Sequence, residues 1–329
     1  MEFPGLFLDA SLYAKTRRPE GSTVYDLLII GGGPASMSAA IYAARKVLNL
    51  AILTSDMGGQ MRETSDVENY LGFQNVNAMD LVKRFEEQVR SFDIAIGTDI
   101  KVKEIRKNGN LFDAHLEDGT IFSGKSAIVA TGERHRHLAV PGEKEFTGKG
   151  VSYCATCDAP LYKEKKVMII GGGNSAFTTA LDLSRGNSEI VMVNFVKGWQ
   201  ADAVMQDRIR KYEKAQMLDF HETVHIEGKE KAESAVVRDR DTGTEKRIPV
   251  DGIFVEIGLL PNSEPVKDLL RLNDRGEVIV DCACGTSVPG VFAAGDVTSV
   301  PHKQIIISAG EGAKAALSAY DYLVNASLI

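Results

Sequence analysis

The sequence predicts an α/β protein built from two Rossmann-like dinucleotide-binding units. Two glycine-rich turns carry this prediction, GGGPAS at residues 31–36 and GGGNSA at residues 171–176. Each turn follows a short apolar run, at residues 25–30 and 167–170, and precedes a stretch of helical character. Strand, tight turn and helix N-terminus together hold a pyrophosphate on backbone N–H groups, so two such units predict two nucleotide cofactors. The alternative is that both turns are only structural parts of α/β units.

Composition places the chain among globular proteins and excludes several classes. Its 329 residues are too many for one ordinary core and suggest two domains. The net charge of −7 argues against a nucleic-acid binder, because no basic surplus can displace counterions. No apolar run approaches the roughly 20 residues that span a bilayer. Four cysteines are too few for a disulfide-stapled secreted scaffold, so we expect a cytoplasmic protein. Residues 1–24 do not resemble a signal peptide and are interpreted as a mobile or docking arm.

The first part of the chain alternates strands and helices. After the strand at 25–30 and its turn, hydrophobic periodicity and turn residues predict helix 37–47, strand 50–53, polar loops at 57–60 and 67–73, helix 80–92, strand 94–96, a meander of strands 101–106, 111–116 and 120–122, and strand 126–130. The strand at 50–53 lacks the usual acidic residue at its end, so Thr54, Ser55 and Asp56 all remain candidates to contact a ribose.

The second part repeats this pattern after the basic stretch RHRH at residues 134–137. We interpret the histidines of that stretch as solvated linker residues and not as metal ligands, because no partners stand at ligand spacing. Beyond the strand at 167–170 the pattern predicts helix 174–184, strand 190–193, helix 203–215, strand 252–257, a boundary at 259–262, strands 278–280 and 291–294, and a long Ala-rich helix 305–323.

Cys154 and Cys157 form a C-x-x-C ahead of the second glycine turn, and Asp158 follows directly. This spacing brings two sulfurs close enough for a disulfide and tends to lower the pKa of one thiol, which suits electron exchange. The Asp158 carboxyl is placed to pass protons to or from one of the two sulfurs. A zinc site shared with Cys282 and Cys284 is the alternative, but C-x-C is poor spacing for zinc, and we interpret those two as small buried hydrophobes.

Taken together, these motifs resemble the low-molecular-weight thioredoxin reductase family. Within it the pattern is most similar to the flavoprotein subunit of alkyl hydroperoxide reductase, without the N-terminal domains of that protein. The resemblance extends from about residue 25 to the C-terminus. It rests on GGGPAS (31–36), GGQ (58–60), VENYLGF (67–73), ATG (130–132), SYCATCD (152–158), GGGNSA (171–176), IGLLPN (257–262), TSVPGVFAAGD (286–296) and KQIIISAGEGAKAALSAYDYL (303–323).

The resemblance implies two three-layer ββα domains, the second inserted into the first. An FAD domain would comprise residues 1–136, with 1–24 as an extension, and residues 263–329. A nicotinamide-type domain carrying the C-x-x-C would comprise residues 137–262. The family also implies a homodimer that passes electrons to a thioredoxin- or glutaredoxin-like protein.

The same resemblance assigns residues to both cofactors and to the chemistry. FAD is expected at Gly31, Gly33, Pro34, Ala35, Gly59, Gln60, Asn69, Thr131, Gly132, Asp296, Gln304 and Ile305. A nicotinamide nucleotide is expected at Gly171, Gly173, Asn174, Ser175, Ala176 and Asn194. Cys157 would face the flavin, Cys154 would attack the partner disulfide, and Asp158 would be the acid/base.

The chain departs from the family pattern in two places. Ser36 replaces the usual third glycine of the first turn, which we expect to be tolerated because both residues are small. The H-R-R-x-x-x-R pattern that grips the 2′-phosphate of NADPH is replaced by NFVKGWQ at residues 194–200, without any of the three arginines. NADH is therefore the expected donor, although Asn194 stands where NADH sites usually present a carboxylate.

These observations favour an FAD-dependent disulfide reductase and leave three alternatives. The same enzyme can take electrons from a non-nicotinamide carrier of the ferredoxin type. An NADH oxidase would pass electrons from flavin directly to oxygen. A non-enzymatic flavin- or metal-binding module is the third, and the intact CATCD motif at 154–158 opposes it.

Overall fold

The computed structural model describes residues 17–63 and 66–329. Residues 1–16, which form most of the predicted N-terminal arm, lie outside the described part. The chain divides into two compact units, one ending at Arg134 and resuming at Leu260, the other comprising His135–Leu259. Within the described ranges, no helix combines the length and the apolar character needed to cross a membrane.

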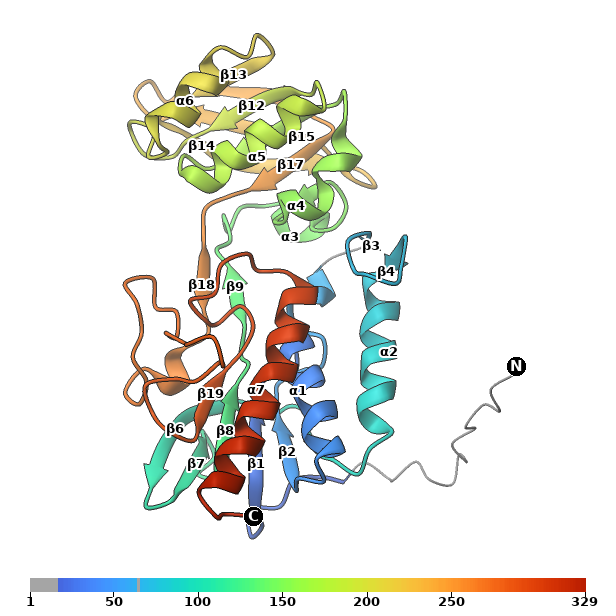
Figure 1. Ribbon diagram of the computed structural model, residues 1–329. Coiled ribbons are helices and arrows are strands. Elements are labelled where there is room, and N and C mark those ends of the chain that lie inside the picture. The colour runs from blue at the N-terminus through green and yellow to red at the C-terminus, as the bar shows by residue number, and fades with distance from the viewer. Residues whose placement is uncertain (1–16, 64–65) are drawn as a thin grey trace, which may run out of the picture. The chain divides into compact units, whose positions relative to one another are not determined.

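The first unit is organised around a seven-stranded sheet (Figure 1). Its strands, in spatial order, are β5 (Ala95–Gly97), β2 (Leu50–Leu53), β1 (Val24–Ile30), β8 (Ile121–Val129), β7 (Leu111–Leu116) and β6 (Val102–Asn108), with β19 (Val291–Ala293) also paired to β8. The pairs that join β5, β2, β1, β8 and β19 are parallel, whereas β6, β7 and β8 form an antiparallel meander. This layout confirms the predicted Rossmann-like unit with its β-meander.

Strand β8 was predicted as two strands separated at residues 123–125, and this division is wrong. Its N-terminal part pairs with β7, where Gly124 faces Phe112, and its C-terminal part pairs with β19, where Ala127 faces Val291. One strand thus belongs to both the meander and the parallel sheet. Gly124 and Lys125 looked like a break in the sequence, but the ladder with β1 continues on both sides of them.

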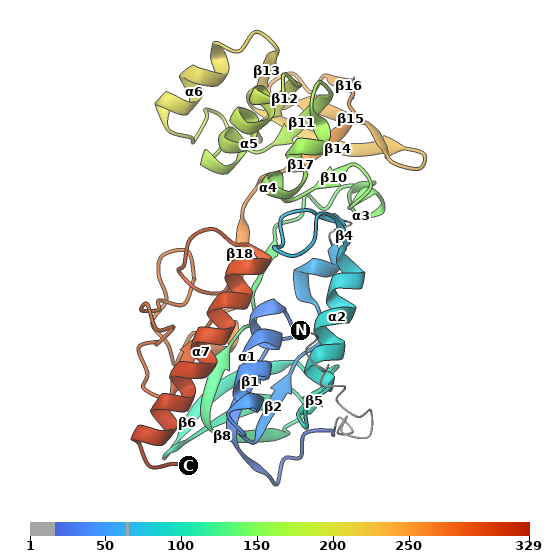
Figure 2. The same cartoon turned by 45° about the vertical axis from the view of Figure 1, so that its right-hand side comes forward.

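Two helices of the first unit, α1 (Pro34–Arg45) and α7 (Ile305–Asn325), lie side by side on the sheet, and α2 (Ala78–Arg90) flanks α1 (Figures 1 and 2). A buried cluster rich in alanine joins α1 and α7 to the inner strands. The predicted helix at 37–47 begins earlier, because Pro34 has the fixed φ that suits the first helical position.

Shorter elements complete the first unit. They are the 3₁₀ turns η2 (Gly59–Glu63) and η4 (Glu264–Val266) and the small hairpin β3 (Asp66–Val67) and β4 (Val76–Asn77). The predicted strand at 278–280 is absent, because Val278 forms only isolated bridges, to Leu272 and Thr298.

The second unit has three layers. A parallel five-stranded sheet in the order β10 (Val151–Ser152), β17 (Gly252–Val255), β11 (Lys166–Ile170), β12 (Glu189–Val193) and β13 (Ala215–Leu218) lies between helices and an antiparallel sheet of β14 (His221–Gly228), β15 (Ala232–Asp239) and β16 (Glu245–Pro249). One core packs this sheet against the helices, and another packs it against the antiparallel strands.

The helical elements of the second unit are α3 (Glu143–Phe146), α4 (Ala155–Asp158), η3 (Ala159–Tyr162), α5 (Asn174–Arg185) and α6 (Ala203–Arg210). Helix α6 ends five residues before the predicted end at Ala215, because Ala215 is the first residue of β13. The two chain segments that connect the units pair as a two-stranded sheet of β9 (Glu133–His135) and β18 (Leu259–Pro261).

Candidate functional site

The first glycine turn has the geometry of an anion-binding helix start. Gly31 has a φ of 120°, and a Cβ at this position would lie 2.1 Å from the Ala130 carbonyl oxygen, so only glycine fits. Gly33 precedes α1 without a side-chain cap, and a Cβ there would meet nothing within 4 Å. The space at the start of α1 is therefore clear, which leaves room for a pyrophosphate at this helix start. These residues fit the diphosphate of FAD.

Ser36, which departs from the family pattern, is fully buried in this turn. Its Oγ donates a hydrogen bond of 2.5 Å to the Gly31 carbonyl oxygen. The hydroxyl thus stabilises the turn that the usual glycine would leave without a side chain.

The other residues predicted to hold FAD lie at the carboxyl ends of the parallel strands and in the loops beside them. Asn69 Nδ2 donates to Gln304 Oε1 over 3.1 Å, which joins two of them. Gln60 Nε2 donates to the Glu133 carbonyl oxygen over 2.7 Å, and Thr131 Oγ1 donates to the Asn262 carbonyl oxygen over 2.7 Å. Of the three ribose candidates after β2, Thr54 is buried, Ser55 is exposed and Asp56 is partly exposed.

A cluster of carboxyl groups lies beneath these loops, and two of its members were missed by the sequence analysis. Asp296 accepts a hydrogen bond of 2.9 Å from Ser308 Oγ, and burial raises its pKa. Glu311 accepts a 2.8 Å bond from Gly295 N and also has a pKa raised by burial. Glu133 is only 5% exposed, and burial together with the nearby Asp296 raises its pKa to about 8. The sequence offered two clues: Glu311 is a charged residue inside the Ala-rich helix, and Glu133 directly follows the ATG motif at residues 130–132.

We expect Glu133→Gln to stabilise the protein at alkaline pH. The Glu133 pKa rises from 4.5 to about 8 on folding, so the unfolded state binds fewer protons between these values. The free energy of unfolding therefore falls as pH rises through this window, and the loss is complete above about pH 8. Because glutamine does not ionise, the free energy of unfolding of the variant should exceed that of the wild type by about 2–3 kcal/mol near pH 9. This is less than the full ~1.4 kcal/mol for each pKa unit of the shift, because water reaches the ionised carboxylate of the wild type.

Urea denaturation near pH 5 and pH 9 measures this effect, and Glu117→Gln, at an exposed acid of the same unit, is the control. Equal pH dependence of the wild type and the Glu133 variant would show that Glu133 ionises freely in the folded protein.

The C-x-x-C forms a disulfide between Cys154 and Cys157, with 5.3 Å between the Cα atoms. Cys154 caps the single turn α4, and its Sγ accepts a hydrogen bond of 3.2 Å from Cys157 N. Ser152 Oγ accepts a 3.1 Å bond from Cys154 N. Asp158 ends the same turn and donates its N–H to the Cys154 carbonyl oxygen over 3.1 Å. Both cysteines are partly exposed.

An aromatic and acidic network lies directly before the disulfide. The Tyr153 ring stacks on His135 at 4.7 Å, and its Oη donates to Glu143 Oε1 over 2.7 Å and contacts His137 Nδ1 at 3.0 Å. Burial and the neighbouring His137 lower the His135 pKa to about 4, so this histidine is neutral at physiological pH. The RHRH histidines were interpreted as solvated: His137 is exposed, whereas His135 is only partly exposed and stacks on Tyr153.

The second glycine turn repeats the geometry of the first. Gly171 has a φ of 146°, and a Cβ there would lie 2.2 Å from the Glu256 carbonyl oxygen. Gly173 precedes α5 with no side-chain cap and open space before it. This turn fits the diphosphate of a dinucleotide. Ser175 Oγ and Thr179 Oγ1 donate to the Glu256 carboxylate, whose pKa burial raises.

At the far end of this predicted nucleotide site, Asn194 follows β12 and is only 2% exposed. Its Nδ2 donates to two carbonyl oxygens of the following loop and to the Asp219 carboxylate. Phe195 is 53% exposed, and the Arg240 guanidinium stacks on its ring at 3.8 Å. Asn174 Oδ1 accepts from Asp202 N over 2.8 Å. Asp219 and Arg240 were not predicted, because they directly follow strands β13 and β15, which come later in the chain.

The remaining cysteines do not behave alike. Cys284 is buried, and burial raises its pKa to about 11, as expected of a small hydrophobe. Cys282 is exposed, so the interpretation of both as buried is wrong. No group of three or more His, Cys, Asp or Glu side chains able to hold a metal ion occurs among the described residues.

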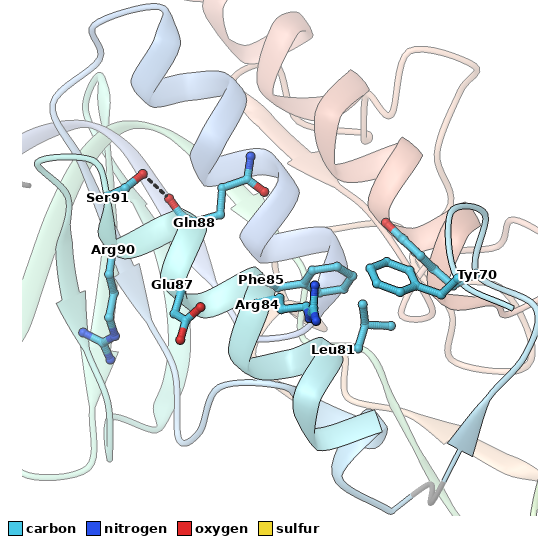
Figure 3. Close-up of a pocket in the computed structure, with 9 residues that line it drawn as sticks. Tyr70, Leu81, Arg84, Phe85, Glu87, Gln88, Arg90 and Ser91 are labelled. Atoms are coloured by element: carbon cyan, nitrogen blue, oxygen red, sulfur yellow. Dashed lines mark hydrogen bonds between the residues drawn. The ribbon is translucent and has the colours of Figure 1, made fainter. Parts of the chain in front are cut away.

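A surface hollow lies along α2 (Figure 3). Tyr70 and Phe85 form one side of it with ring centroids 5.4 Å apart, and the Arg84 guanidinium lies over the Phe73 ring at 5.5 Å. Its lining is completed by Leu81, Glu87, Gln88, Arg90 and Ser91. None of these residues was predicted to bind a cofactor, and the hollow holds neither glycine turn nor cysteine.

Comparison with known proteins agrees with this arrangement. The family model described as pyridine nucleotide-disulphide oxidoreductase matches residues 25–316. The alkyl hydroperoxide reductase F subunit of Staphylococcus aureus (strain MSSA476) is 41% identical over 306 residues, which is 93% of this chain and 60% of that protein. The protein of the same name from Pseudomonas putida is also 41% identical over 306 residues, 92% of this chain and 59% of its own. The chain thus spans about 60% of the length of these curated relatives.

Solved structures of similar length also match. Thioredoxin reductase from Streptococcus pyogenes is 34% identical with a TM-score of 0.86, covering 92% of this chain and 99% of that one. Thioredoxin reductase of T. acidophilum is 38% identical with a TM-score of 0.62, covering 91% and 99%.

Proposed function

The chain belongs to the pyridine nucleotide-disulphide oxidoreductase family, and we propose that it is an FAD-dependent disulfide reductase that passes electrons from NADH through the Cys154–Cys157 pair to a thioredoxin- or glutaredoxin-like protein. The observation that carries this proposal is the disulfide in the same unit as an open dinucleotide turn, with a second such turn in the other unit. The family implies a flavin and a nicotinamide cofactor.

The chain's own residues perform two tasks for these cofactors. The turn at Gly31–Ala35 and the loops around Asp296 would hold FAD, and the turn at Gly171–Ala176 would hold the nicotinamide nucleotide. When bound, FAD supplies a redox group that takes two electrons from a nicotinamide and releases them to a disulfide.

The dithiol chemistry follows from the cysteines and the adjacent acid. In the reduced pair, the Cys154 thiolate attacks one sulfur of the partner disulfide and displaces the other, which takes up a proton. Cys157 then attacks Cys154 Sγ, so the Cys154–Cys157 disulfide forms again and the partner leaves as a dithiol. The Cys157 N–H, which meets Cys154 Sγ in the disulfide, is available to stabilise the Cys154 thiolate. Asp158 moves the protons that this exchange requires.

Two further parts of the proposal rest on the relatives. The solved neighbours named above are thioredoxin reductases, which supports an acceptor of the thioredoxin type. The homodimer is proposed from the family resemblance of the sequence motifs. The few cysteines agree with a cytoplasmic location.

We expect NADH to be a far better donor than NADPH. A 2′-phosphate is dianionic and is usually held by paired arginines, whereas residues 195, 196 and 200 offer Phe, Val and Gln. Each charge-assisted hydrogen bond is worth about 1.5–3 kcal/mol, so losing these contacts should favour NADH by on the order of 10²-fold in kcat/KM. Lys197 is one flexible, exposed cation 3.4 Å from the Asp241 carboxylate, so it can supply only a weak contact in their place.

Stopped-flow reduction of the flavin by NADH, NADPH and a reduced ferredoxin-type carrier, run in parallel, tests this expectation. A preference for NADPH would contradict it. Reduction by the carrier alone would make the non-nicotinamide donor the correct function, and peroxide formation without a protein acceptor would indicate an NADH oxidase.

A further inference from the structure

The loop after β12 holds two side-chain amides against the second glycine turn. A Cβ built on Gly172 would lie 2.3 Å from Asn194 Oδ1 and 2.6 Å from Gln200 Oε1. The backbone of the loop is tied to the same residue, because Gln200 N and Ala201 N donate to the Gly172 carbonyl oxygen over 2.9 and 3.1 Å. Two amide oxygens are therefore held at the turn that precedes α5.

The hydrogen-bond partners of Asn194 decide which way its amide points. Nδ2 donates to the carbonyl oxygens of Val196 and Gly198 over 2.8 and 2.9 Å and to Asp219 Oδ1 over 3.0 Å. All three partners are acceptors, so an amide turned by 180° would place its oxygen against all of them. The nitrogen must face the loop, and the oxygen must face the glycine turn. Gln200 is oriented in the same sense, since its Nε2 donates to the Gly198 carbonyl oxygen.

Asp219 is the charged member of this network, and it comes from the end of the neighbouring strand β13. Its two carboxylate oxygens accept from Gly198 N over 3.2 and 2.9 Å, in addition to the bond from Asn194. Asp219 thus closes the loop and holds the Asn194 amide in place. It also supplies a negative charge directly behind Asn194, although β12 itself ends in a neutral residue.

The cations near this loop are engaged in other contacts. Arg240 stacks on Phe195 and donates to its carbonyl oxygen over 2.7 Å. Lys197 lies 3.4 Å from the Asp241 carboxylate. Both cations are therefore bound to groups of the loop and of the turn after β15.

We propose that the oxygens of Asn194 and Gln200 accept hydrogen bonds from the ribose hydroxyls of a dinucleotide, and that Asp219 is the residue that positions Asn194 for this task. The inference rests on the proposed use of a nicotinamide donor and identifies what selects it. Free ribose hydroxyls donate hydrogen bonds to these oxygens. A 2′-phosphate, which offers only acceptors, meets two acceptor oxygens with a carboxylate behind one of them.

Binding of ADP-ribose and of 2′-phospho-ADP-ribose tests the proposal without electron transfer, because neither probe carries a nicotinamide. Isothermal titration calorimetry gives both affinities. The emission of Trp199, the only tryptophan of the chain, reports directly from the loop. The wild type should bind ADP-ribose at least about tenfold more tightly than its 2′-phosphate.

Asn194→Asp is the decisive variant. A carboxylate is the usual ribose ligand at this position, so Asn194→Asp would preserve or improve ADP-ribose binding if Asn194 merely took the place of that carboxylate. In this structure the carboxylate oxygen that replaces Asn194 Nδ2 would face three hydrogen-bond acceptors. We therefore expect ADP-ribose binding to weaken at least about tenfold. Adding Asp219→Asn should restore part of the loss, because an amide at 219 can donate to a carboxylate at 194. Asp182→Asn, in the last turn of α5, is the matched control.

Asp219→Asn alone, which is conservative enough to fold, should reduce the discrimination against the 2′-phosphate by about fivefold, because the charge behind Asn194 is lost. The inference is overturned if Asn194→Asp, folded by circular dichroism, binds ADP-ribose as tightly as the wild type. It is equally overturned if Asp219→Asn leaves both affinities unchanged. A wild-type protein that binds neither probe refutes the nicotinamide donor itself, and this inference with it.

Discussion

Cys157→Ser should abolish the reduction of protein disulfides while FAD stays bound and reducible. Cys157 forms the internal disulfide with Cys154, and serine can neither form that bond nor release a mixed disulfide from Cys154. The loss of turnover should therefore be complete to background, on the order of 10⁴-fold or more. Turnover with a thioredoxin-type substrate and the flavin absorbance of the same sample measure the two parts of this result.

Cys282→Ser provides the matched control, because it removes an exposed thiol of the same chain outside the disulfide. Its turnover should equal that of the wild type. Normal turnover in Cys157→Ser would mean that electrons reach the acceptor by a route that bypasses the dithiol.

Asp158→Asn should slow turnover by roughly 10²–10⁴-fold, the range typical of losing general acid–base help. Asp158 ends the short turn that begins at Cys154, and its N–H is bonded to the Cys154 carbonyl oxygen, so the substitution should preserve the backbone of the turn. Flavin reduction by the donor should remain at the wild-type rate, because only the proton transfers of thiol exchange are affected.

The two half-reactions can be separated by stopped-flow mixing, first with donor and then with oxidised acceptor. A slow second step with an unchanged first step supports the role of Asp158. An unchanged second step would remove Asp158 from the proton transfer.

Features that depend on neighbouring residues in the sequence were predictable. Each glycine turn lies between its own strand and helix, so the patterns around Gly31 and Gly171 were sufficient to predict both dinucleotide units. The disulfide was predictable for the same reason, since Cys154 and Cys157 share one turn. The likeness of the motifs to a known family added the insertion of one domain into the other.

Features built from distant strands were not predictable from local patterns. Asp219 belongs to the end of β13, and only the pairing of β13 with β12 brings it to Asn194. Glu133 and Glu311 are separated by most of the chain, and their burial beside Asp296 follows from the way β19 and α7 close the first unit. One predicted helix end was also wrong, because Ala215 is the first residue of β13 and not the last residue of α6.

Electrons taken up by this protein should reside on both a flavin and the Cys154–Cys157 pair. Anaerobic titration with dithionite, followed by flavin absorbance and by thiol counting after denaturation, measures this capacity directly. The wild type should take up four electrons per chain and gain two thiols, whereas Cys157→Ser should take up two electrons and gain none. A wild-type protein that accepts only two electrons, with the disulfide still intact after the flavin is fully reduced, would contradict the account.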